Sequence, residues 1–598
     1  MNTLIYLILF YHPYVFYNMS MRRIFILIFI LILIGSCSSL SVPFFFPAPT
    51  PSSTSLPTTP SKTRSLTPTV LPPLPPSPLA ATDTPVTTPP VIPPPEQFTV
   101  LFHPDDFLYV GDQVSFEVIS PIDLEVNDAE LSVQVDTPDG PHLERVKFAP
   151  WGIQGRFEAA MIWAWDTKTE DPGLHHLTFK AQPQGYTWTE QVTLLPFSAM
   201  PPDQADAHWA STQTDCCTVF YITDTASERD LPTLTAMIDT QAQDAIEKMG
   251  ANFTEPITIT ILPRTLGHGG FASTEISVSY LDRNYAANFW AMVVHHEMIH
   301  AIDGHLGGDF RPSIFVEGLA VYMTGGHYKP EPLMPRAAAL LGGYLDWYIP
   351  LKSLANDFYA SQHEIGYLEG AALIEYLVKT YGLDAFFSFY RDIHINQGES
   401  QSDAIDAALE KHFSISFTKL EMDFLAALRA ETDTSSWVDD VRLTVTYYDT
   451  MRRYQQLLDP SAYFRTAWLL DNKTMRERGI VADYLRHPHT PTNLALETLF
   501  ITTSQRGSEK DYTSAFQTLD MISSVLDAIE HGTTDPFSVS ILAANYLTIA
   551  TTLQQQGYEV QNLSVNDDSA TTQVTTSSGP DLILLNLQRI GGQWSTKP

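Results

Sequence analysis

The stretch VVHHEMIHAID, residues 293–303, holds three histidines and one glutamate. On an α-helix, side chains four residues apart share a face, so His296 and His300 can reach one tetrahedral metal ion. Glu297 completes the pattern HExxH and supplies a general base beside that ion. His295 lies off this face, because the residue four positions after it is an isoleucine. The spacing predicts a zinc-binding helix in which His296 and His300 are ligands.

A third ligand must come from outside this stretch. His305 is one candidate, but its spacing departs from HExxHxxGxxH, because the glycine is one place late and the histidine one place early. Glu317, in the segment FVEGLAVYM, is the better candidate. Sixteen residues separate it from His300, enough for a loop and a return into a second apolar helix. A carboxylate there would leave one zinc position open for water.

HExxH followed by E-G-L-A-x-Y resembles the gluzincin branch of the zinc metallopeptidases, which includes thermolysin and aminopeptidase N. The resemblance covers about residues 215–430 of the chain. It implies that His296, His300 and Glu317 bind Zn²⁺ and that Glu297 activates water. It also implies a largely helical α+β peptidase domain that acts on a peptide or protein substrate.

Two further segments fit the resemblance. IGYLEGAALIEYLVKTYG, residues 365–382, is similar to the YxxG helix of aminopeptidase-N-like enzymes, in which a tyrosine stabilises the oxyanion. Tyr367 is the matching residue, and His363 is a weaker substitute donor. TEISVSYLD, residues 274–282, occupies the place of the family's edge strand, which holds an extended substrate through its backbone.

The chain also departs from the family. Thermolysin-like enzymes carry an aspartate four residues after the ligand glutamate, where this chain has Val321. Asp303 is the candidate stand-in for that outer partner. The GxMEN-type motif of aminopeptidases is missing, so no motif recognises a substrate amino terminus. We therefore expect an endopeptidase.

The N-terminal region is predicted to be an export signal followed by a lipid anchor. An apolar run at 24–34 follows two arginines and is shorter than the roughly 20 residues of a membrane span. The sequence Ile-Gly-Ser-Cys that ends at Cys37 resembles a bacterial lipobox, so residues 1–36 are the predicted signal peptide. The alternative is an uncleaved signal anchor in which Cys37 has no role. Residues 37–97 are rich in Pro, Ser and Thr and are predicted to be a disordered tether.

Three folded regions are expected beyond the tether, in a multidomain α+β protein. Short β-rich runs with turn signals at 98–200 predict an immunoglobulin-like β-sandwich. The adjacent His175 and His176 would point to opposite faces of one strand there, so they cannot share a metal. Residues 201–432 are the predicted peptidase domain. Residues 433–598 are predicted to form a mainly helical α+β accessory domain.

Composition narrows the functional classes. With 34 basic and 68 acidic residues, the net charge of −34 argues against binding to nucleic acid. Three cysteines are too few for a disulfide scaffold. The adjacent Cys216 and Cys217 could form a vicinal disulfide or remain free thiols, and the sequence leaves both open.

These features together predict a zinc metallopeptidase outside the cytoplasm, lipid-anchored to a bacterial membrane through Cys37. The alternative is a catalytically inactive peptidase-fold protein that binds an envelope component or another polymer.

Overall fold

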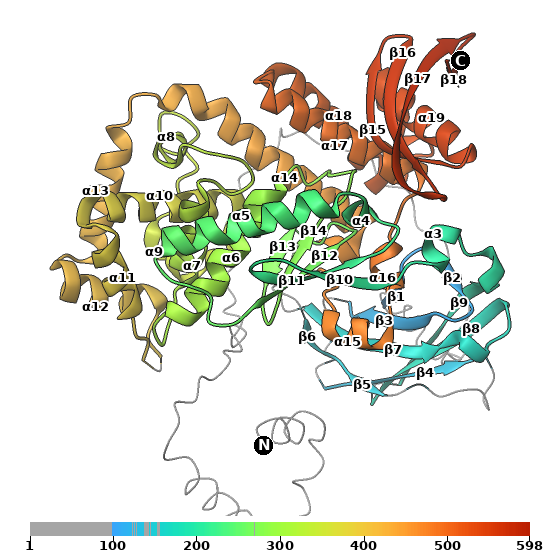
Figure 1. Ribbon diagram of the computed structural model, residues 1–598, viewed down its shortest axis with the longest axis horizontal. Helices are drawn as coiled ribbons and strands as arrows, with labels where there is room; N and C mark the ends of the chain where they lie inside the picture. The colour runs from blue at the N-terminus through green and yellow to red at the C-terminus, as the bar shows by residue number, and fades with distance from the viewer. Residues whose placement is uncertain are drawn as a thin grey trace, which may run out of the picture. The chain divides into compact units, whose positions relative to one another are not determined.

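The computed structural model describes residues 98–597 except for short gaps at 122–123, 125, 127, 137–142, 144, 152–155, 184, 268, 397 and 464. The predicted signal peptide, Cys37 and the tether lie outside the described residues. The described chain is α+β, with several sheets and a large helical region (Figure 1). Within these residues, no helix has the length and apolar character needed to cross a bilayer.

Two sheets near the start of the described chain enclose a common core. One has the order β1–β3–β7–β6, formed by Thr99–His103, Gln113–Ile119, Arg156–Asp166 and Ala149–Trp151. The other has the order β2–β9–β8–β4–β5, formed by Leu108–Tyr109, Tyr186–Leu195, Gly173–Gln182, Glu130–Val135 and Val146–Lys147. Alternate residues of both sheets point inward, so Phe116, Trp165 and Phe179 meet in one apolar cluster.

A five-stranded sheet follows, in the order β10–β11–β12–β14–β13. Its strands are Trp209–Gln213, Cys217–Ile222, Ile257–Leu262, Ile276–Ser279 and Gly270–Ala272. β11, β12 and β14 run parallel, while β10 and β13 are antiparallel to their neighbours. The short helix α3 (Pro202–Ala205) precedes β10, and the short helix α4 (Ala226–Arg229) follows β11.

The strand order corrects the prediction for TEISVSYLD. Its strand, β14, has β12 on one side and β13 on the other, so it is not at the edge. A tight turn at Ser273, whose N–H donates to the Glu275 carbonyl, folds β13 back along the outside of β14. The edge strand is therefore β13, the three residues that precede this turn. Tyr280 lies beyond the end of β14, and its hydroxyl donates to Asp230.

Four helices build the region that contains the HExxH motif: α5 (Leu231–Met249), α6 (Trp290–Leu306), α7 (Ser313–Thr324) and α10 (His363–Tyr381). α6 contacts α5, α7, β13 and β14 (Figure 1). α7 and α10 approach closely at Gly318 and Gly370, because a Cβ atom on Gly318 would lie only 2.6 Å from the Gly370 carbonyl oxygen. The glycines of EGLA and YLEG thus let the two helices meet.

Further helices surround this group: α8 (Leu333–Ala338), α9 (Leu351–Asn356), α11 (Leu383–Arg391), α12 (Gln401–Phe413) and α13 (Phe417–Arg429). Their apolar faces join those of α6, α7 and α10 in the largest core of the described chain. Three buried aromatic rings, Phe315, Phe386 and Tyr390, lie where α7 meets α11. This core fixes the helices that carry the motif residues.

The last part of the chain is helical and ends in an antiparallel sheet. Its helices are α14 (Val438–Leu458), α15 (Asn472–Arg478), α16 (Ala482–Leu485), α17 (Pro491–Ser508), α18 (Tyr512–Glu530) and α19 (Ile541–Gln555). The sheet has the order β15–β16–β17–β18, formed by Tyr558–Asn566, Ser569–Thr576, Gly579–Ile590 and Gln593–Thr596.

This last part also makes buried contacts with the region before it. The Tyr448 ring of α14 stacks on Tyr328 at 4.0 Å between centroids. Arg452 of α14 donates two hydrogen bonds to Glu364 of α10, at 2.8 and 2.7 Å. Trp468 shares a small core with Ile222 and Leu262 of the five-stranded sheet. Residues on both sides of position 432 therefore support the same helices.

Candidate metal centre

His296, His300 and Glu317 converge on one point between α6 and α7. The two Nε2 atoms are 3.0 Å apart, and Glu317 Oε2 lies 3.4 Å from His296 Nε2 and 3.2 Å from His300 Nε2. Zinc–nitrogen and zinc–oxygen bonds of roughly 2.0–2.1 Å in a tetrahedron require ligand atoms about 3.3 Å apart. The donor types and their separations therefore fit a zinc ion bound by these three residues.

The Glu317 carboxylate favours a bound cation, whereas His300 carries a proton that a cation must displace. Despite burial, His300 and His296 hold the pKa of the Glu317 carboxyl well below its usual value. Burial lowers the pKa of His296, which favours the neutral imidazole that a metal requires. For His300, burial acts in the same direction, but Glu317 prevails and raises its pKa to about 9. A metal ion must displace that proton from His300.

Glu297 lies beside the cluster and is 5% exposed. Burial, together with the nearby Glu317 charge, raises the pKa of its carboxyl to about 7, while His300 opposes the shift. A carboxylate with a pKa near neutrality suits a general base that must both accept and return a proton. Its Oε1 atom borders the edge strand, since a Cβ on Gly270 would lie 3.0 Å from it.

The cluster opens into a cavity of about 230 Å³ between β13, α6, α7 and α10. Two glutamates, Glu297 and Glu317, are the only carboxylates among the described residues that line it. Aromatic and imidazole rings make up much of the remaining wall, so flat side chains line the cavity.

Tyr367 and His363 lie in this wall. The Tyr367 ring stacks on His363 at 4.1 Å and on His327 at 4.2 Å, and lies 6.4 Å from the His296 ring. Burial raises the pKa of the Tyr367 phenol well above its ordinary value, so the hydroxyl keeps its proton. Within the described residues, that hydroxyl forms no hydrogen bond. It is available as a donor.

Two residues of the cavity wall, Tyr359 and His327, were not predicted from the sequence. Tyr359 donates from its hydroxyl to Glu317 Oε1 at 2.6 Å, on the opposite carboxylate oxygen from the histidines. It lies in a short 3-10 turn, Phe358–Ala360, which no motif marks. His327 follows the glycine turn after α7 and has no spacing relation to HExxH. Only the folded chain brings either residue to the cavity.

Other polar residues near the motif lie away from the cluster. His295 bonds Thr324 through Nδ1 at 2.8 Å, its Nε2 lies 2.9 Å from Asp244, and burial lowers its pKa to about 4. His305 is exposed on the last turn of α6.

The outer partner that the sequence left unassigned is not supplied by Asp303, whose carboxylate accepts from Arg311 and Tyr390. His296 Nδ1 is buried and has no hydrogen-bond partner among the described residues. Val321, at the position of the family's aspartate, is fully buried and apolar.

A second histidine–carboxylate group lies on β8 and does not fit a metal. Asp136, Glu170 and His175 bring ligand-type atoms within 4.8 Å of one another. However, His175 Nδ1 pairs with Asp136 Oδ2 at 2.9 Å, and its Nε2 pairs with the Asp171 carbonyl at 2.8 Å. Both ring nitrogens act as donors, so neither has a lone pair for a metal. His176 points to the exposed face, as strand alternation predicted.

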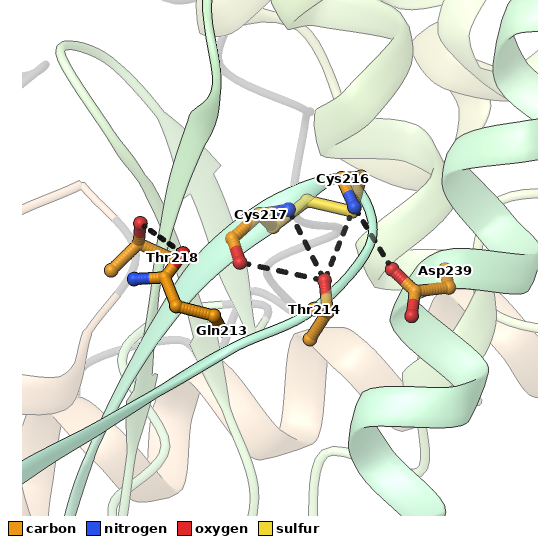
Figure 2. The surroundings of a disulfide bond; sticks show 6 residues. All are labelled: Gln213, Thr214, Cys216, Cys217, Thr218 and Asp239. Atoms are coloured by element: carbon orange, nitrogen blue, oxygen red, sulfur yellow. Dashed lines mark hydrogen bonds between the residues drawn. A yellow bond between two sulfur atoms is a disulfide. The ribbon is translucent and has the colours of Figure 1, made fainter.

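Cys216 and Cys217 form a disulfide, which decides between the two alternatives that the sequence left open (Figure 2). The Cys216 N–H donates to Asp239 of α5, and the Cys217 N–H donates to the Thr214 hydroxyl. Cys217 begins β11, and Cys216 borders a hollow of about 860 Å³ that shares no lining residue with the candidate metal site.

Comparisons with known proteins identify no family for this chain. No family model and no curated protein matches the chain. Among solved structures, the chain has a similarity to an aminopeptidase N family protein from Idiomarina loihiensis, with 9% identity and a TM-score of 0.24. The match covers 55% of this chain and 76% of that chain. A likeness this low carries no weight for the fold or function of this chain.

Proposed function

We propose that this chain is a zinc-dependent peptidase, with His296, His300 and Glu317 as metal ligands and Glu297 as general base. The convergence of three donor atoms at separations of 3.0–3.4 Å, with a buried carboxyl beside them, supports this proposal most directly. A purely structural cluster of His296, His300 and Glu317 has no need for a second glutamate, Glu297, beside it in the same cavity.

The side chains around the cluster have complementary roles in peptide hydrolysis. Bound Zn²⁺ would act as a Lewis acid that polarises the scissile carbonyl and lowers the pKa of water. Glu297 accepts a proton from the attacking water at a carboxylate oxygen and passes it to the leaving amine. Tyr367 donates its phenolic hydrogen to the negative charge that develops on the carbonyl oxygen.

We propose that the substrate binds as an extended strand along β13. This strand pairs with β14 on one side only, so its outer backbone groups face the cavity side of the sheet edge. Backbone pairing there would hold peptides of varied sequence next to Glu297.

We propose that the chain cleaves within peptides, as an endopeptidase, and does not act as an aminopeptidase. An aminopeptidase needs a carboxylate that binds the substrate's free amine. The two carboxylates that line the cavity are already assigned as base and ligand. Glu364, close to the wall, is neutralised by a bidentate pair with Arg452. The described residues therefore leave no acidic group to select an amino terminus.

The test compares the full-length chain with Glu297→Gln on an unbiased peptide library, together with metal analysis of both proteins. We expect one zinc per chain in each and a loss of cleavage of roughly 10²–10⁴-fold in the variant, the usual contribution of a general base. Glu375→Gln is the control, because that carboxylate pairs with Lys379 outside the cavity. Unaltered cleavage in Glu297→Gln would refute the mechanism. A zinc-free wild type that binds peptides without cleaving them would favour the binding-module alternative.

We also propose that Cys37 anchors the protein by a lipid to the outside of a bacterial membrane. The support is the lipobox-like sequence before it and the Pro/Ser/Thr-rich segment after it. Labelling of the full chain with a fatty acid in a bacterial host, compared with Cys37→Ser, tests this. Equal labelling of both proteins would refute the anchor.

A further inference from the structure

Tyr359 meets Glu317 on the side away from the histidines. Its hydroxyl donates to Oε1 at 2.6 Å, while Oε2 is the oxygen that lies 3.4 and 3.2 Å from the two histidine nitrogens. We infer that Tyr359 is a positioning residue, which holds the Glu317 carboxylate so that Oε2 alone is presented to the metal. The inference rests on the proposed zinc site and deepens it.

The fold holds the Tyr359 ring firmly enough for this role. The 3-10 turn Phe358–Ala360 bridges α9 and α10 and also contacts α7. Phe358 is buried, and its ring packs against Tyr359 at 5.3 Å and against Tyr367 at 5.2 Å. The phenol is therefore held against α7 by its packed turn and by its bond to Glu317.

Among the described residues, no group other than Tyr359 forms an outer hydrogen bond to the three proposed ligands. His296 Nδ1 is buried without a partner among the described residues, and Val321 cannot provide one. Asp303 is engaged with Arg311 and Tyr390. Outer hydrogen bonds normally fix the orientation of metal ligands and raise their affinity. In this site, the Tyr359 hydroxyl gives that support to the carboxylate ligand.

The same contact separates the roles of the two cavity tyrosines. A phenol has one proton to donate, and Tyr359 gives its proton to Glu317. The Tyr367 hydroxyl has no such commitment within the described chain. Tyr367 can therefore donate to the substrate, whereas Tyr359 acts through the ligand. The two residues should differ in which measured quantity their loss changes.

The experiment measures zinc affinity in the full chain by competition with a chromophoric chelator, for wild type, Tyr359→Phe and Tyr367→Phe. We expect Tyr359→Phe to bind zinc roughly 10–100-fold more weakly, the usual effect of removing an outer partner. Tyr367→Phe should bind zinc as the wild type does. Tyr348→Phe is the matched control, because it removes another partly buried tyrosine–glutamate bond, to Glu421 at 3.1 Å, away from the cavity.

Each result has a distinct meaning. Wild-type zinc affinity in Tyr359→Phe, with a lower kcat at saturating zinc, would overturn the positioning role and make Tyr359 a substrate donor. An equal loss of affinity in Tyr348→Phe would attribute the effect to general destabilisation and would also overturn it. A wild type that binds zinc but cleaves no peptide overturns the proposed function alone, because the affinity difference still supports the inference. A wild type without zinc overturns both.

The absorption spectrum of the Co²⁺-loaded protein provides a second readout that does not need activity. If Tyr359 holds Glu317 to one oxygen, its loss frees Oε1 to approach the metal and changes the coordination geometry. We expect a changed visible spectrum in Tyr359→Phe and unchanged spectra in the other two variants. Identical spectra in all four proteins would count against the inference.

Discussion

Replacement of Gly270 by alanine should disturb the proposed base without touching the proposed metal ligands. Gly270 lies on the edge strand β13, where its α-hydrogens face α6. An added Cβ would lie 2.5 Å from Val293 Cγ1, 3.0 Å from Glu297 Oε1 and 3.2 Å from Glu297 Cγ. His296, His300 and Glu317 are not among these neighbours.

The structure sets the size of the effect. Carbon atoms in contact normally stay about 3.5–4.0 Å apart, so the approach to Val293 is too close by about 1 Å or more. A valine within a helix has one strongly preferred χ1 rotamer and cannot turn away cheaply. Either β13 or Glu297 must move by a comparable distance. A displacement of about 1 Å at a reacting group can lower the rate by roughly 100-fold.

The assay is kcat for peptide cleavage at saturating zinc, together with zinc affinity. We expect Gly270→Ala to lose roughly 100-fold in kcat with wild-type zinc affinity, and Gly270→Ala/Val293→Ala to recover much of the loss. Gly304→Ala is the control. Gly304 lies on α6, the helix that carries Val293 and Glu297, and the nearest atom outside the helix backbone would be 4.0 Å from its added Cβ. Unchanged kcat in the single variant, or no recovery in the double variant, would refute the steric reasoning.

Three further predictions concern stability and redox state. Burial raises the pKa of the Asp483 carboxyl from 3.8 to about 7, so the free energy of unfolding falls as pH rises through that range. Asp483→Asn should therefore unfold at a higher urea concentration than wild type at pH 8, but not at pH 4. The shift corresponds to about 4 kcal/mol at most. Arg452→Met should cost about 3–5 kcal/mol in chemical unfolding, because it removes the cation that pairs with the buried Glu364 carboxylate. Glu364→Gln added to it should restore part of the loss. Alkylation of the unfolded chain should label Cys216 and Cys217 only after treatment with a dithiol, and zinc stoichiometry should not change, since neither sulfur lines the metal cavity. Labelling of both without reduction would contradict the disulfide.

Local spacing was sufficient for the helix motifs but not for the sheet. HExxH and YxxG depend on the 3.6-residue period, which fixes side-chain directions within one element. The position of a strand in a sheet depends on which other strand pairs with it, and the sequence of TEISVSYLD does not contain that information. It has good β-forming residues, and these suit an interior strand as well as an edge. The three-residue strand at Gly270 was too short to be recognised.

The sequence by itself determined the candidate site residues: His296 and His300 on one helical face, Glu297 beside them, and an apolar EGLA helix able to return a carboxylate. What only the tertiary structure decided is how that set closes. The crossing of α7 and α10 at two glycines places Glu317 and Tyr367 at one cavity, and a 3-10 turn brings Tyr359 to the free carboxylate oxygen. The physical reason is that distances between separate elements arise from packing, which no periodicity within one element encodes.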